Sequence, residues 1–79
     1  MNIKVLGTGC ANCKTLEKSV TNVVSEMGIT AKIEKVEDFQ QIMNYGIMRT
    51  PGLVINEKVV VSGRVPSTSE IKDFIQKHQ

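Results

Sequence analysis

The two cysteines of the chain, Cys10 and Cys13, lie in the stretch GTGCANCK (residues 7–14). A strand-like apolar run precedes this stretch and a helical pattern follows it, so the pair is predicted to lie at the start of a helix. The unpaired backbone N–H groups and the helix dipole stabilise a thiolate there, which lowers the pKa of a cysteine. Two intervening residues allow both sulfurs to lie near the same helix end, within bonding distance. Such a pair can exchange disulfides, bind a soft metal ion or form a structural disulfide.

Disulfide exchange gives each cysteine a separate role. Cys10, nearest the loop, is predicted to be the exposed thiol that attacks a substrate disulfide. Cys13, one turn inward, is predicted to attack the resulting mixed disulfide and to release the reduced substrate. Lys14 is a candidate for electrostatic support of the thiolate.

The same two cysteines allow two other uses. A structural disulfide would close a loop of only about four residues, which stabilises a fold by about 1.9 kcal/mol against about 4.7 kcal/mol for a loop of about 100 residues. The leading alternative is a soft-metal carrier that binds a Cu(I)-type ion, since Gly-x-x-Cys-x-x-Cys before a helix also resembles copper-chaperone domains. Thr8, however, occupies the position of their usual methionine, and those domains close on a strand. His78, the remaining candidate zinc ligand, is expected to be solvated.

The elements that must position the cysteines follow from the hydrophobic periodicity. We predict a strand at residues 3–6, a helix that ends at Gly28, a strand from residue 29 that fades near residue 36, a short helix between Asp38 and Gly46, apolar strands at 53–55 and 59–61, and a last helix that begins with the capping box of Ser67 and Glu70. The first crossover requires a parallel strand pair, and the hairpin near Asn56 requires an antiparallel pair. The predicted fold is therefore α/β, in the order β-α-β-α-β-β-α, with a mixed four-stranded sheet, helices on both faces and the all-apolar strands at its centre.

Composition narrows the class of protein. The chain has 79 residues, 41% of them hydrophobic, and a net charge of +2, which is typical of one globular domain spanning residues 1–79. Nucleic acid is not an expected partner, because the basic residues form no block and only three residues are aromatic. No apolar run approaches the roughly 18 residues of a membrane span, and the first residues lack the pattern of a signal peptide. We therefore expect a cytoplasmic protein, in which a cysteine pair is more often catalytic or metal-binding than structural.

Read together with TPGLVI (residues 50–55), the Cys-x-x-Cys motif resembles the thioredoxin superfamily, and in particular its short thioredoxin- and glutaredoxin-like redox-active disulfide proteins. The resemblance covers essentially the whole chain and implies a three-layer sandwich. It implies that Cys10 is the nucleophile and Cys13 the resolving thiol. Pro51 matches the family's cis-proline, beside which the backbone of Thr50 would pair with an extended substrate segment. Gly63 matches a glycine that lets the substrate approach closely.

Three departures from the family patterns limit what the resemblance implies. Ala11 and Asn12 replace the Gly-Pro of thioredoxin and the Pro-Tyr typical of glutaredoxin. Lys4 stands where thioredoxin has a buried acid in the strand before the motif, and residues 62–67 lack the glutathione-binding pattern of glutaredoxins. We therefore predict a monomeric oxidoreductase without a bound cofactor, which reduces protein disulfides and is itself reduced by a protein similar to thioredoxin reductase rather than by glutathione. The redox direction stays open, as does a third hypothesis, a degenerate binding module.

Overall fold

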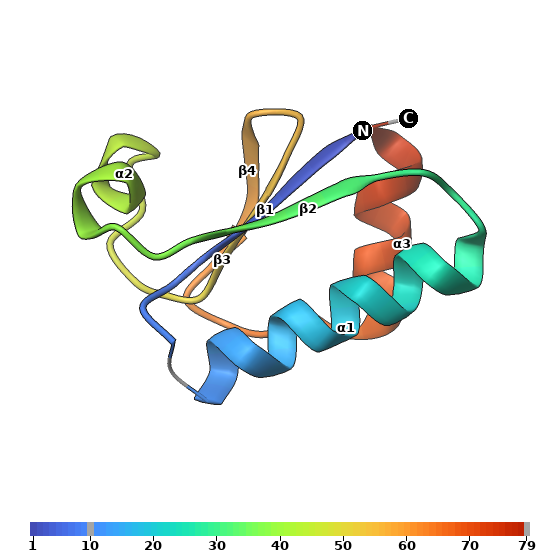
Figure 1. Cartoon of the computed structure of the whole chain (residues 1–79), viewed down its shortest axis with the longest axis horizontal. Helices are drawn as coiled ribbons and strands as arrows, with labels where there is room; N and C mark the ends of the chain where they lie inside the picture. The colour runs from blue at the N-terminus through green and yellow to red at the C-terminus, as the bar shows by residue number, and fades with distance from the viewer. Residues whose placement is uncertain (10, 79) are drawn as a thin grey trace.

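The computed structural model describes residues 1–9 and 11–78 of the chain (Figure 1). Its elements are β1 (Asn2–Leu6), α1 (Ala11–Met27), β2 (Lys32–Val36), α2 (Phe39–Asn44), β3 (Gly52–Ile55), β4 (Lys58–Ser62) and α3 (Thr68–Lys77). This order confirms the predicted β-α-β-α-β-β-α sequence of elements. None of the helices in the described ranges has the length and apolar character needed to cross a membrane.

The four strands form one mixed sheet in the order β2-β1-β3-β4. β1 pairs in parallel with β2 and antiparallel with β3, and β3 pairs antiparallel with β4. The prediction that both apolar runs lie at the covered centre is correct for β3, which is buried throughout, but wrong for β4. β4 is an edge strand, where Val59 is 39% exposed, and its pairing with β3 is irregular between Leu53 and Val54.

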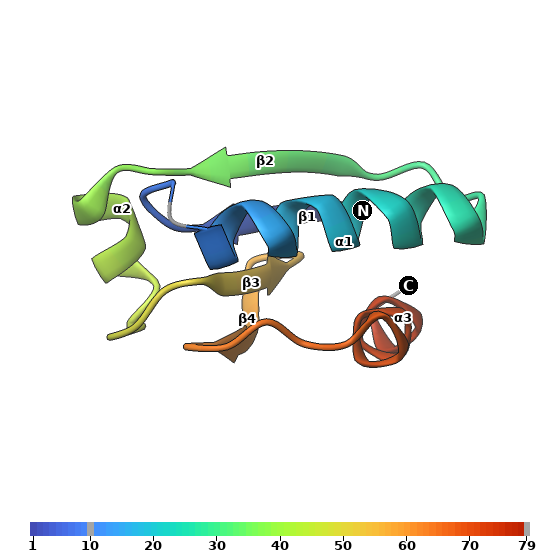
Figure 2. The ribbon, with the colours of Figure 1, turned by 90° about the horizontal axis from the view of Figure 1, so that it is seen from below.

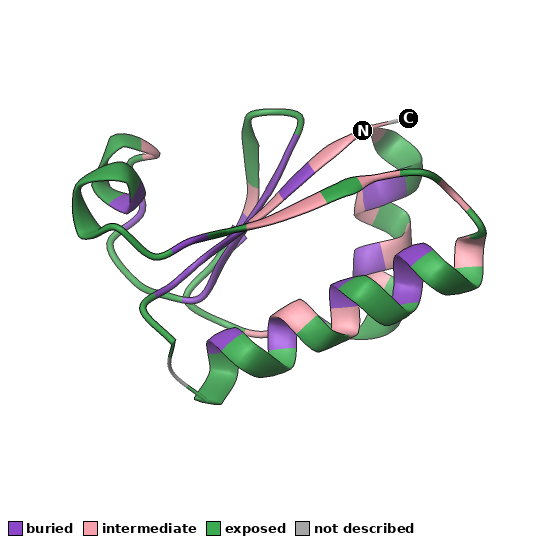
Figure 3. Ribbon diagram, in the orientation of Figure 1, coloured by how far each residue is buried: buried purple, intermediate pink, exposed green. Residues whose placement is uncertain are grey.

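Helices cover both faces of the sheet, but unequally. α1 and α3 lie on one face, where their buried side chains meet those of β1, β3 and β4 in a large apolar core. α2 lies on the other face and contributes Ile42 to a smaller cluster, together with Leu6, Val36, Ile47 and Val54. Figures 1 and 2 show α2 and the start of α1 at one end of the sheet and α3 at the other. In Figure 3 the buried residues of α1 follow the side that faces the sheet, and the outer side is exposed.

The second strand begins later than predicted. Gly28 ends α1 with a positive φ of 65°, as expected of a glycine after a helix. The N–H of Ile29 still donates to the carbonyl of Val24 in α1 (3.4 Å). The first backbone hydrogen bond to the N-terminal segment that pairs with this strand is from Lys32 N–H to Met1 O (2.9 Å). Residues 29–31 therefore join the helix to the sheet, although their alternating pattern predicts a strand.

The hairpin turn explains a second difference from prediction. Asn56 and Glu57 have positive φ values of 50° and 69°, which is the pattern of a two-residue type I′ turn. The Asn56 side chain accepts a hydrogen bond from Asn2 N–H (3.0 Å) and donates one to the carbonyl of His78 (3.0 Å). His78 is consequently half-buried at the end of α3, with Nδ1 2.8 Å from Phe74 O, and is not simply solvated.

Both predicted helix caps are present. The Asp38 side chain accepts a hydrogen bond from Gln40 N–H at the start of α2, and Ser67 and Glu70 form a reciprocal capping box at the start of α3. In the six-residue α2, however, Ile42 is the one residue classed as buried. Phe39 is 69% exposed and Met43 is 48% exposed, so the apolar character of this short helix is directed largely toward solvent.

Candidate active site

The junction between β1 and α1 holds Cys13 in a tightly packed position. Gly7 N–H donates to Val36 O (2.9 Å), which ties the end of β1 to β2. Cys13 lies in the first turn of α1 and is 5% exposed. A Cβ atom on Gly7 would clash with the Cys13 sulfur, so a glycine is required here by close approach.

The predicted pair is only half described by the structure. Cys13 is disulfide-bonded, and the described residues include no free cysteine. Cys10 lies outside the described residues, so its predicted role as the attacking thiol stays a prediction.

The loop before β3 lies against this junction. The Thr50–Pro51 peptide bond is cis, which is the isomer that the resemblance implies. Pro51 is buried and its carbonyl accepts a hydrogen bond from Gly63 N–H (2.9 Å). Thr50 is exposed, and its Cβ would be 3.9 Å from a Cβ placed on Gly7. The structure thus brings three of the predicted site residues, Thr50, Pro51 and Gly63, together at the end of the sheet where Cys13 lies.

An apolar cavity of about 380 Å³ adjoins Thr50 on the α2 side. Its walls come from the loop before the cysteines, from α2 and from residues 47–50, and consist of Thr8, Phe39, Ile42, Met43, Ile47, Met48, Arg49 and Thr50. Met48 is 93% exposed. Of these residues, Thr50 alone was predicted to be a site residue. The pattern of the short helix, with apolar residues on more than one side, and Met48 next to Arg49 are the sequence signals that point to the others.

A second cavity, of about 270 Å³, lies beside Cys13 on the α1 side of the sheet. Four charged residues share its lining with Val5, Gly7, Gly9 and Cys13: Lys14, Glu17, Lys35 and Glu37. The Lys35 Nζ is 3.0 Å from Glu17 Oε2. Glu17 accepts this hydrogen bond, and together with the charges of Glu17 and Glu37 it raises the pKa of Lys35 above its ordinary value. Of these four charged residues, Lys14 alone was predicted to lie near the thiolate.

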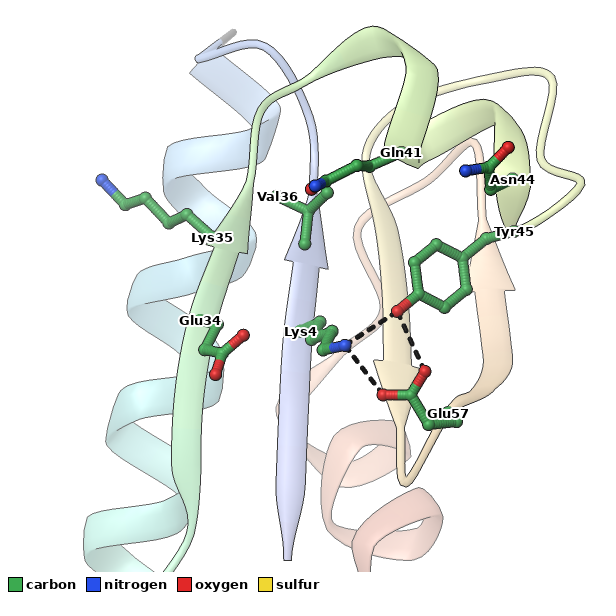
Figure 4. Close-up of a pocket in the computed structure, with 8 residues that line it drawn as sticks. All are labelled: Lys4, Glu34, Lys35, Val36, Gln41, Asn44, Tyr45 and Glu57. Atoms are coloured by element: carbon green, nitrogen blue, oxygen red, sulfur yellow. Dashed lines mark hydrogen bonds and ion pairs between the residues drawn. The ribbon is translucent and has the colours of Figure 1, made fainter.

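Lys4 lies on the opposite face of the sheet, in a third cavity of about 550 Å³ (Figure 4). Its ammonium group donates to Tyr45 Oη (2.9 Å) and to Glu57 Oε1 (2.7 Å), and the Tyr45 hydroxyl donates to Glu57 Oε2 (3.1 Å). These bonds raise the pKa of Lys4 and lower the pKa of Glu57. Lys4 is therefore bonded to residues on the α2 side of the sheet, whereas its neighbour Val5 lines the cavity beside Cys13. The residue at the position of thioredoxin's acid thus contacts a different part of the molecule from Cys13.

Comparison with known proteins agrees with this arrangement. A thioredoxin-domain family model matches residues 1–76. The chain is 43% identical over 75 residues to a thioredoxin of Methanothermobacter thermautotrophicus, covering 95% of this chain and 97% of that protein. It is 36% identical over 76 residues to a thioredoxin of Methanocaldococcus jannaschii, covering 96% and 87% of the two chains. A probable thioredoxin of Archaeoglobus fulgidus is 34% identical over 71 residues, covering 86% and 77%.

The fold and the matched relatives define the class of protein as a thiol–disulfide oxidoreductase. The chain belongs to the thioredoxin family. The predicted α/β fold, the family resemblance and the oxidoreductase activity are thereby confirmed. None of the three relatives named above is described as a metal carrier.

Proposed function

We propose that residues 1–79 act as a single domain that reduces protein disulfides through a Cys10/Cys13 dithiol–disulfide cycle. The Cys10 thiolate attacks one sulfur of the substrate disulfide, so that a Cys10–substrate bond forms and the substrate S–S bond breaks. The Cys13 thiolate then attacks the Cys10 sulfur, which forms the Cys10–Cys13 bond and releases the second substrate thiolate. Two electrons pass to the substrate, and its two thiolates take up the two protons that the dithiol has lost.

The observation that carries this proposal is the position of Cys13. It lies in the first turn of α1, where unpaired N–H groups favour a thiolate, and it packs against Gly7 beside the Thr50 loop. A thiol held there is protected from unrelated reactions and remains close to the place where a substrate segment would lie. This is the arrangement that a resolving thiol needs.

Thr50, Pro51 and Gly63 are proposed to bind the substrate segment. Within the described part of the chain, Thr50 forms no hydrogen bond with another backbone group, so its own N–H and C=O are free to pair with an extended strand. Gly63 is exposed, and its N–H donates a hydrogen bond to the carbonyl of Pro51. A side chain at residue 63 would therefore lie beside the bound substrate segment. The apolar cavity between α2 and residues 47–50 is suited to an apolar side chain of that segment.

The electron donor is proposed to be a protein reductase similar to thioredoxin reductase. The cycle requires no bound cofactor, because both electrons reside on the two sulfurs. We propose that the protein works as a monomer in the cytoplasm, where a reducing environment would keep the dithiol available.

Reduction of a protein disulfide, with insulin and a dithiol donor, tests the proposal against the soft-metal carrier. We expect turnover in the wild type and complete loss in Cys10→Ser. Anaerobic purification with metal analysis is the parallel measurement. Stoichiometric, tightly bound Cu(I) together with no turnover would favour the carrier, and inactivity without metal would favour a degenerate binding module.

A further inference from the structure

The resolving step needs an acceptor for the proton of Cys13. A thiol attacks a disulfide only as the thiolate, and the start of α1, which favours the Cys13 thiolate, does not itself take up the proton. In this chain the position that the family resemblance matches with a buried acid is Lys4, which is bonded to Tyr45 and Glu57 on the other face of the sheet. The acceptor must therefore come from another part of the molecule.

The cavity beside Cys13 supplies one. Glu17 follows Cys13 by four residues on α1, which places both side chains on the same side of the helix, and both line this cavity. The Glu17 side chain is 33% exposed, and Lys35 of β2 holds it through the 3.0 Å ion pair. Figure 4 shows the Lys35 side chain directed away from the Lys4–Tyr45–Glu57 network.

The remaining charged groups around the cavity are less suited to this task. The Lys14 side chain donates hydrogen bonds and does not accept them. Glu37 is exposed in the segment after β2 and, among the residues that the structure describes, has no ion pair that would orient its carboxylate as Lys35 orients that of Glu17. The cavity, at about 270 Å³, exceeds the roughly 30 Å³ that one water occupies, so water can bridge the sulfur and the carboxylate.

We propose that Glu17 is the proton acceptor for Cys13 in the resolving step, a role that rests on the function proposed above. The Cys13 S–H bond breaks, and its proton passes through a cavity water to the Glu17 carboxylate. The sulfur electron pair forms the bond to Cys10 as the Cys10–substrate bond breaks, and the leaving substrate thiolate carries away the electron pair of the broken bond. Glu17 then returns the proton to solvent. Lys35 is a positioning residue that orients the carboxylate.

An aromatic disulfide with a chromophoric thiol, such as dithiobis(nitrobenzoate), separates the two steps. Reduced protein releases one chromophore when Cys10 forms the mixed disulfide and a second when Cys13 resolves it. In Glu17→Gln we expect the second release to slow by at least about tenfold at neutral pH, because general-base assistance is lost. The first release should be unchanged. Above the ordinary thiol pKa of about 8.5 the variant should approach the wild type, since hydroxide then removes the proton.

Glu26→Gln is the matched control, because Glu26 also lies on α1 and pairs with a lysine of another element, Lys72, at 2.7 Å. Glu17→Asp should restore most of the rate. Three results would each overturn the assignment of Glu17. The second release could be equally fast in Glu17→Gln and Glu26→Gln, it could be slowed in Glu17→Gln by the same factor at every pH, or it could be slowed in Glu37→Gln instead. If wild-type protein released no chromophore at all, the proposed dithiol cycle itself would be wrong.

Discussion

Two regions near the cysteine motif, called here the first and the second wall, differ in how tightly they are packed. The first wall is the β1–α1 junction, which buries Cys13 to 5% exposure and holds its sulfur so close to Gly7 that no side chain fits there. The second wall is formed by α2 and residues 47–50, and it leaves Phe39 69% exposed and Met48 93% exposed. The first wall fixes the position of one sulfur atom, and the second presents apolar side chains to solvent.

This difference matches the two requirements of disulfide exchange. Attack along the S–S axis depends on the position of a sulfur to within a fraction of an ångström. Binding of varied polypeptide segments is better served by flexible apolar groups, of which methionine is the most adaptable. If the first wall positions the sulfur and the second wall binds the substrate, changes in the first wall should lower the rate of disulfide exchange. Changes in the second wall should weaken the binding of protein substrates.

The largest expected effect comes from Gly7→Ala, which introduces a Cβ into the space of the Cys13 sulfur. Overpacking of this kind costs about 1–3 kcal/mol of unfolding free energy, and displacement of the sulfur should lower turnover by about 100-fold. Urea unfolding and reduction of a small disulfide measure the two effects. Gly52→Ala is the control, since its Cβ would come closest to the flexible Ile47 Cδ1, at 2.8 Å, and would meet Leu6 at an ordinary contact distance of 3.5 Å. A Gly7→Ala protein with wild-type turnover would show that the first wall does not fix the sulfur.

A smaller, selective effect is expected from the second wall. Replacing Phe39 and Met48 together by Ser removes exposed apolar surface from the cavity lining. We expect KM for a protein disulfide to rise by about tenfold, since burial of apolar surface contributes about 25 cal/mol per Å². Stability should change by less than about 0.5 kcal/mol, as is usual for exposed positions. Turnover of a small disulfide should not change.

Val59→Ser provides the matched control for that pair. Val59 is also exposed and apolar, at 39%, but it lies on the edge strand β4 and does not line the cavity. An equal rise in KM for this control would mean that general surface hydrophobicity, and not the second wall, governs substrate binding.

Loss of the α3 cap should affect stability without affecting either wall. Ser67→Ala removes the hydrogen bond from Glu70 N–H (3.2 Å) and should lower the free energy of unfolding by about 1 kcal/mol. Thermal or urea unfolding measures the loss, and Ser67→Asp, another good cap, should restore most of it. Turnover should stay at the wild-type level while the protein is folded, and a parallel fall in turnover would argue against the independence of the two regions.

The smallest expected effect is a pH dependence at the same cap. Two hydrogen bonds from Arg64 and one from Ser67 N–H lower the pKa of Glu70 to about 2. Because the pKa in the folded state lies below that in the unfolded state, Glu70 contributes stability above an unfolded-state pKa of about 4.3. This contribution is lost as the pH falls toward 2. Unfolding free energies of wild type and Glu70→Gln should therefore converge in acid, and a constant difference between them would show that folding does not lower the pKa of Glu70.

The features that the sequence predicts correctly depend on nearby residues. Gly28, Asp38 and the Ser67–Glu70 box mark helix ends through bonds that span only a few positions, so their roles could be inferred without the fold. The cysteine pair was recognisable from its spacing at a helix start, whereas the role of Thr50–Pro51 followed from the family resemblance.

The features that the sequence does not predict depend on distant contacts. Val59 is apolar like the residues of β3, and only the strand order shows that β4 lies at the edge. Glu17 and Lys35 resemble ordinary surface charges until the parallel β1–β2 pairing brings them to the cavity beside Cys13. The exposure of Phe39 follows from how α2 packs, which its hydrophobic pattern leaves undetermined.

The most direct test of the account is capture of a mixed disulfide with the Cys13→Ser variant. We predict that this variant forms a one-to-one covalent complex with a disulfide-containing protein, that a dithiol dissolves the complex, and that mass spectrometry locates the bond at Cys10. The complex should be absent when Cys10 is also replaced. Failure of Cys13→Ser to accumulate a complex with any disulfide tested, or a bond at another position, would contradict the assignment of the two sulfurs on which the mechanism depends.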